Sequence, residues 1–483
     1  MAYLGKKGYS LLKTNLNAKE QQFIRDELTV KGYVPKSPVQ PEPFSIYRES
    51  PNKFYVPRYF GQDNFGEFNE NKIPQGDDID IEFAGDLREY QINIVNKYID
   101  YVKDSGGGLL DVDPGKGKTV MGLYIIAKLK KKTLVIVHKS FLLNQWIERI
   151  QQFLPTARVG KIQGQIIDIE NKDIVIGMLQ SLSQKEYPEN TFDSFGLSIY
   201  DETHHLGAEV FSRCMMKSIT NYTLGLSGTM QRKDGLTKVF KMFLGDIVHK
   251  EKTDTTEHKV IVRAIYYKVD DDDFNEIKYD YRGNPLYSTM ISKLCNYNHR
   301  SEFILKVLET ELERNSEQQI MILAHNKTLI TYLHKAIEHR CLATVGYYIG
   351  GMKETDLKVS EGKKVIIATY AMASEGLDIK TLTTLIMASP KTDVCQSIGR
   401  ILRTKHTSPL VVDIIDKHDI FEKQWHKRRQ YYMKQKYNII STDNTHYLSN
   451  NWQTVYDPCK IEESIKKIKK TEEPLKGVCL IKI

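Results

Sequence analysis

The segment GGLLDVDPGKGKTVMGLYIIAKL, residues 107–129, decides the fold of this chain. It begins with the apolar run GGLLDV, continues with a turn rich in glycine and lysine, and ends with a stretch of helical character. This order predicts a strand, a loop and a helix. In such a loop, glycines let backbone N–H groups approach phosphate oxygens, and the N-terminus of the following helix adds a favourable dipole.

The residue types in the loop suit the phosphates of ATP. We expect Lys118 to bridge the β- and γ-phosphates and the hydroxyl of Thr119 to ligate Mg²⁺. The backbone of Gly115, Lys116 and Gly117 would surround the phosphates. The general pattern GxxxxGK[ST] has glycine where this chain has Val112. A chance turn of glycines and lysines is therefore the alternative to a phosphate loop.

Short β-branched runs alternate with helical stretches on both halves of the chain. The runs are TLVIVH (133–138), DIVIGM (173–178), LSIYDE (197–202), IMILAH (320–325), KVIIAT (364–369), TLIMAS (384–389) and PLVVDII (409–415). Such alternation indicates βαβ units and buried parallel sheets. We therefore expect an α/β fold with two parallel-sheet domains.

Shifts in composition suggest the domain boundaries. Polar residues, clustered prolines and an aromatic-rich stretch favour a small accessory domain at the N-terminus, and polar and acidic runs favour a connection in the middle. The expected parts are an accessory domain at 1–84, a first α/β domain at 85–250, a connection at 251–300, a second α/β domain at 301–440 and a basic C-terminal extension at 441–483.

Composition limits the class of protein. The chain has 483 residues, 41% of them hydrophobic, and a formal net charge of +8, which permits a nucleic-acid partner without establishing one. The six cysteines lie far apart without metal-ligand spacing, and no apolar run approaches ~18 residues. We expect a soluble intracellular protein in a reducing compartment, without a zinc ribbon, an iron–sulfur insert or a membrane partner.

An acid pair follows the apolar strand LSIY. Asp201 and Glu202 would lie at the carboxyl end of that strand, which is where ligands bind in parallel sheets. Asp201 is expected to hold Mg²⁺ through water, while Glu202 orients the attacking water. A surface Asp-Glu turn is the alternative.

A third segment, QSIGRILR at residues 396–403, lies in the second half. On a helix, Gln396, Arg400 and Arg403 would share one face. Two guanidinium groups on one face suit a γ-phosphate whose charge shifts during transfer. A solvated basic face is the alternative.

Together, the loop, the DExH box Asp201–His204 and the QxxGRxxR segment resemble the motifs of superfamily 2 helicases. The resemblance covers residues 85–435 and implies two tandem RecA-like domains with ATP bound between them. It implies an adenine-side motif at 87–91, with Arg88 and Gln91, and a catalytic role for His204. It further implies a motif Ia at Leu142 to Trp146 with the preceding VIVHK, a motif III at 227–229, and a motif V at Thr369 and 375–378, with Gly376 and Asp378 in the nucleotide cleft.

Within this superfamily the chain looks most like XPB-type DNA helicases and the transcription helicases of large cytoplasmic DNA viruses. XPB-type relatives also carry an apolar residue at the position of Val112. The segment Arg232-Lys233-Asp234 departs from their Arg-Glu-Asp, which puts the role of the middle acid in doubt. The viral likeness implies a virion or viral factory as the location.

The resemblance implies movement on nucleic acid, with DNA favoured, RNA possible, and transcription or repair proteins as candidate partners. An ATP-regulated clamp without turnover is the non-enzymatic alternative. Candidate contacts are motif Ia, motif V and WHKRRQYYMKQKY (425–437), which is also compatible with an ordinary closing helix. The N-terminal aromatics (Phe44, Tyr47, Phe54, Tyr55, Tyr59 and Phe60) favour a small core over base stacking.

Overall fold

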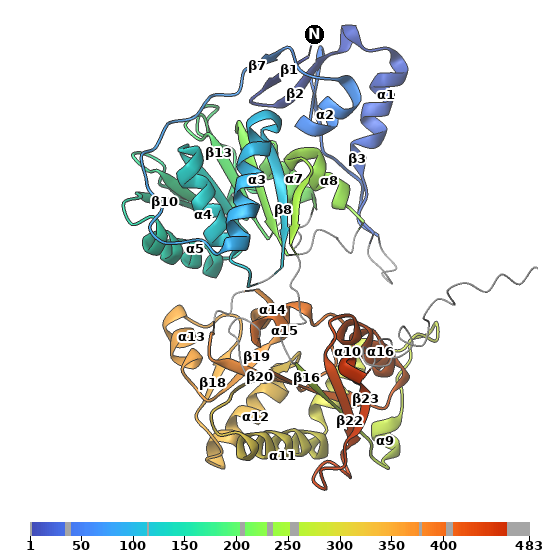
Figure 1. Ribbon diagram of the computed structural model, residues 1–483. Coiled ribbons are helices and arrows are strands. Elements are labelled where there is room, and N and C mark those ends of the chain that lie inside the picture. The colour runs from blue at the N-terminus through green and yellow to red at the C-terminus, as the bar shows by residue number, and fades with distance from the viewer. Residues whose placement is uncertain are drawn as a thin grey trace, which may run out of the picture. The chain divides into compact units, whose positions relative to one another are not determined.

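The computed structural model describes residues 2–33, 40–113, 115–202, 208–228, 235–251, 260–375, 379–401 and 409–460. The chain divides into two compact units, Met1–Thr253 and Asp254–Ile483 (Figure 1). Each unit contains a large, mainly parallel sheet, as expected from the alternating strand and helix pattern.

The first unit is built on an eight-stranded sheet in the order β11-β10-β12-β9-β13-β14-β8-β15. Its strands are β8 (Gly107–Val112), β9 (Thr133–Val137), β10 (Val159–Gln163), β11 (Ile166–Ile167), β12 (Ile174–Met178), β13 (Leu197–Asp201), β14 (Tyr222–Ser227) and β15 (Ile247–Glu251). All neighbours pair in parallel except β10 and β11. Every residue of β8, β9, β12 and β13 is buried, as a parallel sheet covered on both faces requires.

Helices cover both faces of this sheet. They are α3 (Glu89–Ser105), α4 (Lys118–Leu129), α5 (Ser140–Phe153), α6 (Leu179–Gln184), α7 (Ala208–Met215) and α8 (Thr237–Leu244). Leu110 and Val135 pack in one core with α3, α4 and α5, while their neighbours Leu109 and Leu134 belong to a second core with α7 and α8. Successive strand residues thus serve opposite faces.

The N-terminal part adds a five-stranded sheet in the order β5-β6-β2-β1-β7. Its elements are β1 (Tyr3–Gly5), β2 (Gly8–Leu12), a 3-10 turn (Lys13–Asn15), α1 (Ala18–Glu27), β3 (Thr29–Val30), β4 (Phe44–Ser45), β5 (Arg48–Glu49), β6 (Lys53–Val56), α2 (Arg58–Phe65) and β7 (Glu70–Asn71). The strands β3 and β4 form a separate pair.

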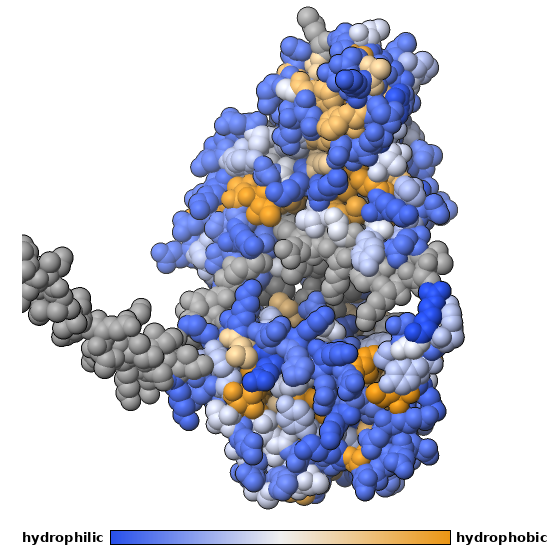
Figure 2. Space-filling view, turned by 90° about the vertical axis from the view of Figure 1, so that its right-hand side faces the viewer, coloured by the Kyte–Doolittle hydropathy of each residue, from blue (hydrophilic) through white to orange (hydrophobic). Residues whose placement is uncertain are grey.

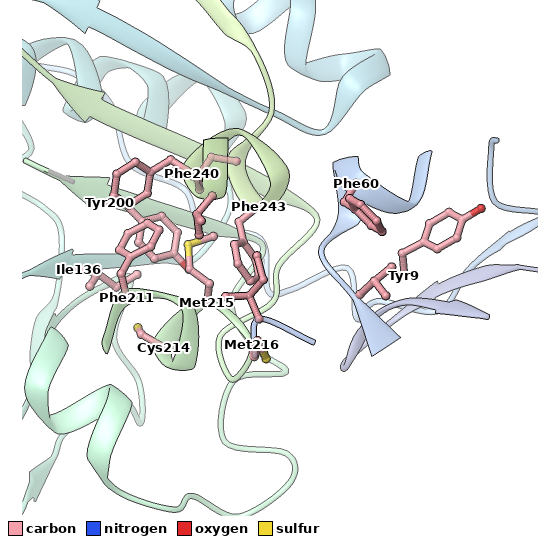
Figure 3. Close-up of a cluster of buried hydrophobic side chains, with 14 of the residues drawn as sticks. Tyr9, Phe60, Ile136, Tyr200, Phe211, Cys214, Met215, Met216, Phe240 and Phe243 are labelled. Atoms are coloured by element: carbon pink, nitrogen blue, oxygen red, sulfur yellow. The ribbon is translucent and has the colours of Figure 1, made fainter. Parts of the chain in front are cut away.

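Three aromatic residues of this part contribute to a buried core. Tyr9, Phe54 and Phe60 are buried in the same apolar cluster as Phe211 and Phe240 of the first α/β sheet's helices (Figure 3). The accessory sheet therefore has its own strand order but shares its core with the rest of the unit. Burial removes Phe54 and Phe60 from any role in base stacking.

The second unit contains an eight-stranded sheet in the order β18-β19-β17-β20-β21-β16-β22-β23. Its strands are β16 (Ile261–Tyr267), β17 (Gln319–Ala324), β18 (Val345–Tyr348), β19 (Val365–Thr369), β20 (Leu382–Met387), β21 (Leu410–Asp416), β22 (Asn438–Asp443) and β23 (Gln453–Tyr456). Only β22 and β23 pair antiparallel. Its helices are α9 (Asp272–Asn275), α10 (Tyr287–Asn296), α11 (Asn298–Arg314), α12 (Lys327–His339), α13 (Glu354–Glu361), α14 (Tyr370–Glu375), α15 (Cys395–Ile401) and α16 (Asp419–Lys434).

Two expected boundaries need correction. Residues 261–300 are not a connection, because β16 lies inside the sheet between β21 and β22, and α10 contributes Met290 and Leu294 to the core. The strand was missed because polar residues precede its β-branched and aromatic sequence, IVRAIYY. Residues 441–456 likewise complete the sheet through β22 and β23, while 461–483 lie outside the described residues.

On the face shown in Figure 2, hydrophilic residues predominate, and the apolar ones gather in small separate patches. Within the described ranges, no helix combines the length and the apolar character of a membrane span.

Candidate nucleotide site

The predicted strand and helix are β8 and α4, and residues 113 and 115–117 belong to the loop between them. Gly115 and Gly117 have φ angles of +84° and +80°, a region that glycine occupies without a steric cost. A Cβ atom on Gly117 would lie 2.4 Å from Nε2 of Gln91. The backbone angle favours glycine at 117, and any larger residue would also displace the side-chain amide of Gln91. Pro114 lies outside the described residues.

The beginning of α3 holds this loop from one side. The side-chain amide of Gln91 donates to the carbonyl of Lys116 at 2.9 Å, and the hydroxyl of Tyr90 donates to the same oxygen at 3.0 Å. The amide oxygen of Gln91 accepts from the backbone N–H of Arg88 at 2.9 Å. The structure thus brings Gln91, one of the two expected adenine-side residues, against the loop. Arg88 is exposed there, and its guanidinium lies 3.4 Å from the hydroxyl of Tyr90.

The acid pair lies at the carboxyl end of β13 and reaches the loop's helix. Nζ of Lys118, the first residue of α4, donates to Oε1 of Glu202 at 2.7 Å. Both side chains are largely buried, with 9% and 21% of their surfaces exposed. The structure therefore joins two predicted segments that are 84 residues apart. A solvated surface turn, the alternative for this acid pair, is excluded by that burial.

Glu202 has an unusual backbone. Its φ angle is +51°, in the left-handed region, which costs a non-glycine residue roughly 1 kcal/mol. Its N–H donates to the carbonyl of Leu226, at the end of β14, at 2.9 Å. The neighbouring strand thus holds a strained turn that points the carboxylate toward Lys118, and such strain is concentrated at functional sites.

Asp201 is a buried carboxylate in a crowded environment. Burial and the negative charge of Glu202 raise the pKa of Asp201 to about 6, while Lys118 and the indole of Trp146 act in the opposite direction. Nε1 of Trp146 donates to Oδ2 of Asp201 at 2.9 Å. A bound cation would relieve the cost of burying this charge.

The residues present fit Mg²⁺ in the way that nucleotide-binding proteins hold it. Mg²⁺ is usually held by one or two protein oxygens and by phosphate oxygens. Asp201 supplies a buried carboxylate, and Thr119 lies in the first turn of α4, beside Lys118. The described residues contain no group of three or more acidic, histidine or cysteine side chains able to hold a metal by themselves.

Sequence reasoning named Trp146 within motif Ia but missed its partner. Trp146 lies on the buried face of α5 together with Leu142 and Ile150. A buried indole N–H normally requires an acceptor, so the position alone signalled a hydrogen bond. The identity of the acceptor depends on how α5 packs beside β13, which no local pattern reveals.

Several predicted site residues belong to the second unit or lie outside the described residues. Gln396 and Arg400 are both in the helix α15, as predicted. Thr369 ends β19 and Glu375 ends α14. Outside the described residues are His204, Thr229, Arg232, Lys233, Asp234, Gly376, Leu377, Asp378 and Arg403.

The basic aromatic segment 425–437 is largely a closing helix. In α16, Trp425, Arg428 and Tyr432 are buried. The guanidinium of Arg428 donates to both oxygens of Asp413, at 2.7 and 2.9 Å, and that pair has almost no exposed surface. These residues stabilise the second unit, so they are unavailable as nucleic-acid contacts.

The two parallel sheets, the phosphate loop and the acid pair define a nucleotide-using protein of the RecA-like class. Residues 84–232 match the family described as "Type III restriction enzyme, res subunit" (ResIII). The chain is 35% identical over 475 residues to "Putative ATP-dependent RNA helicase L396" of Acanthamoeba polyphaga mimivirus, covering 95% of this chain and 90% of the relative. It is 27% identical to QP509L of African swine fever virus, which has the same description, over 79% of each protein. The chain belongs to the superfamily 2 helicases, with relatives in large DNA viruses, and is an ATP-dependent helicase-type enzyme.

Among solved structures, the helicase domain of Hef from Pyrococcus furiosus matches 71% of this chain and 98% of its own. The sequence identity is 14% and the TM-score is 0.48.

Proposed function

We propose that this chain is a DNA helicase or translocase that couples ATP hydrolysis to movement along nucleic acid in transcription or repair. One observation carries the proposal: the ion pair between Lys118 and Glu202, at 2.7 Å, beside the buried Asp201. It joins a phosphate-binding type of loop to a pair of carboxylates that could serve a metal and a water separately.

In this proposal each site residue of the first unit has one role. The backbone of Gly115, Lys116 and Gly117 surrounds the phosphates, and Lys118 donates to the β- and γ-phosphates. Glu202 accepts a hydrogen bond from the attacking water and orients it toward the γ-phosphorus. Arg88 and Gln91 bind on the adenine side.

Thr119 and Asp201 would hold Mg²⁺. When bound, the ion neutralises charge that develops on the phosphate oxygens. Oδ2 of Asp201 accepts the hydrogen bond from Trp146 at 2.9 Å.

Residues of the second unit would complete the machinery. We assign Arg403 as the arginine that stabilises the transferring phosphate, with Arg400 and Gln396 of the same QxxGRxxR segment assisting it. His204 would link the acid pair to the rest of the site. Gly376 and Asp378 would contact the nucleotide.

Nucleic acid would be held mainly through its backbone, which explains how a motor can ignore sequence. The net charge of +8 is compatible with this. Motif Ia, which runs into the start of α5, is the proposed contact in the first unit, through residues other than the buried Trp146. Motif V is the proposed contact in the second unit.

RNA is the second candidate template. It is favoured by the names of the relatives from mimivirus and African swine fever virus, both described as RNA helicases. An ATP-regulated clamp without turnover is the weaker alternative, because Lys118, Glu202 and Arg403 are all present in the sequence.

The test compares ATP hydrolysis in the presence of single-stranded DNA, duplex DNA and single-stranded RNA of equal length at one salt concentration. DNA should stimulate hydrolysis more than RNA. Stimulation by RNA alone would replace the DNA proposal with the RNA one, and no hydrolysis with any polymer would favour the clamp. The Lys118→Ala variant measures contaminating ATPase.

A further inference from the structure

The indole of Trp146 lies where three parts of the nucleotide site meet. Trp146 is fully buried on α5, whose N-terminal end is the proposed nucleic-acid contact. Its N–H donates to Oδ2 of Asp201 at the end of β13, at 2.9 Å. Its ring also lies against α4, because a Cβ atom on Gly122 would come within 3.1 Å of the indole.

This arrangement differs from ordinary packing of a tryptophan. Trp425 in the second unit offers the comparison, since it is equally buried and its N–H donates to the hydroxyl of Tyr266 at 3.2 Å. The acceptor for Trp425 is neutral, whereas the acceptor for Trp146 is the carboxylate assigned to Mg²⁺. Hydrogen bonds to charged groups are stronger and more sensitive to direction.

Gly122 allows the indole of Trp146 to pack closely against α4. A glycine inside a helix is less favourable than alanine by about 1 kcal/mol. Here it lets the indole approach the backbone of α4 three residues after Thr119, the other proposed Mg²⁺ ligand. A shift of α5 would therefore move the partner of Asp201 relative to Thr119.

We propose that Trp146 is a positioning residue: it orients the Asp201 carboxylate for Mg²⁺ and links that carboxylate to nucleic acid bound at the start of α5. This inference rests on the proposed function, because it assumes that Asp201 holds the metal. It gives a physical route by which a polynucleotide can stimulate hydrolysis within the first unit. No movement of the backbone of β13 is required.

The sharpest test replaces Trp146 by benzothienylalanine, which keeps the bicyclic shape but has sulfur in place of the N–H group. Loss of one hydrogen bond to a charged group should raise the Mg²⁺ concentration that half-saturates ADP binding by roughly tenfold. Binding of ADP without Mg²⁺ should not change, and high Mg²⁺ should restore most of the ATP turnover. Stimulation by single-stranded DNA should fall at moderate Mg²⁺.

The same replacement at Trp425 is the matched control and should leave the Mg²⁺ requirement unchanged. If both replacements act alike, or if neither changes the Mg²⁺ requirement, Trp146 only fills space and the inference is overturned. Gly122→Ala is a second test of the same inference. Alanine favours helix formation more than glycine does, yet its methyl group would push the indole of Trp146 by a few tenths of an ångström. It should also weaken Mg²⁺-dependent ADP binding.

Fluorescence tests the link to nucleic acid independently of activity. The chain has three tryptophans, so the double variant Trp425→Phe/Trp452→Phe retains Trp146 alone. Single-stranded DNA should change its emission even without nucleotide, and an unchanged emission would overturn the link. Asp201→Asn tests the role of Asp201 separately from that of Trp146: if this variant does not alter the Mg²⁺ requirement, the proposed function of Asp201 fails, whatever the Trp146 variants show.

Discussion

Lys118 and Glu202 hold each other at 2.7 Å, although each is expected to act on ATP. The ammonium of Lys118 has three N–H donors, so it can turn from Glu202 toward a γ-phosphate when one is present. We infer that nucleotide binding draws Lys118 away and releases the carboxylate to orient water. This competition between Glu202 and a phosphate for Lys118 predicts different effects for substitutions at the two residues.

Lys118→Ala should lower ATP turnover by about 10²-fold or more, because a preorganised charged donor to the transferring phosphate is lost. Steady-state ATPase assays measure this effect. Lys128→Ala, on the exposed face of the same helix, is the matched control. Near-normal turnover in Lys118→Ala would mean that the phosphate loop is misassigned.

Glu202→Gln should bind ATP as tightly as the natural protein, or more tightly, while hydrolysis is abolished. The amide keeps the shape of the side chain but removes the charge that competes for Lys118. Nucleotide binding by calorimetry and single-turnover hydrolysis measure the two effects separately. Glu209→Gln, at an exposed ion pair on α7, is the control. A loss of ATP binding in Glu202→Gln would point to a structural role.

The sequence predicted those parts of the site that depend on local pattern and on the ends of strands. Gly117 and Lys118 are identified by their neighbours in the chain, and Glu202 by the apolar strand before it. Parallel strands carry both groups to one edge of the sheet, so the sequence predicted that Lys118 and Glu202 would lie in the same site. It did not predict the distance between them.

Two features, the burial of Arg428 and the position of β16 in the sheet, depend on tertiary packing and could not be predicted from the sequence. Arg428 lies in a basic run that suggested a nucleic-acid contact, but its guanidinium is buried against Asp413. Charge in a sequence does not say which side of a helix faces the core. The strand β16 was missed for the opposite reason, since its apolar residues follow a long polar stretch and pair with strands that are distant in sequence.

The second unit should lose stability in mild acid because of His325. Burial lowers the pKa of His325 to about 4, with Lys391 contributing. The unfolded chain, whose histidines have a pKa near 6.5, therefore binds more protons than the folded one between these values. Stability is fully present above pH 6.5 and falls as the pH drops toward 4, by roughly 2 kcal/mol at pH 5.

Denaturant unfolding at pH 7.5 and pH 5 measures this loss for the natural protein and for His325→Gln. The variant should lose less stability than the natural protein between the two pH values. His339→Gln, at the exposed end of α12, should behave like the natural protein. An equal loss in all three proteins would assign the acid sensitivity to other groups.

Affinity for single-stranded nucleic acid should fall linearly on a plot of log affinity against log salt concentration. The slope should be close to −0.7 for each phosphate neutralised. Lys139→Ala, at the start of α5, should make the slope less steep by about 0.7, because one phosphate contact is removed. Fluorescence anisotropy at several salt concentrations measures both slopes. A flat plot would contradict binding through the phosphate backbone. An unchanged slope in the variant would exclude Lys139 from the phosphate contacts.

Arg403 should matter for turnover far more than for ATP affinity. We assign it as the arginine finger because it ends the QxxGRxxR segment, and such a group stabilises charge only when the second unit approaches ATP bound to the first. Arg403→Ala should therefore reduce turnover by roughly 10³-fold while ATP binding is retained. Because nucleic acid is expected to promote that approach, most of the stimulation by single-stranded DNA should also be lost.

A merely structural arginine would instead lower the melting temperature and leave the stimulation ratio intact. Measuring ATPase with and without DNA, nucleotide binding and melting temperature in Arg403→Ala and Arg400→Ala separates these possibilities. If Arg403→Ala folds normally and keeps its stimulation while Arg400→Ala loses it, the finger is Arg400. If both keep it, hydrolysis does not depend on this helix.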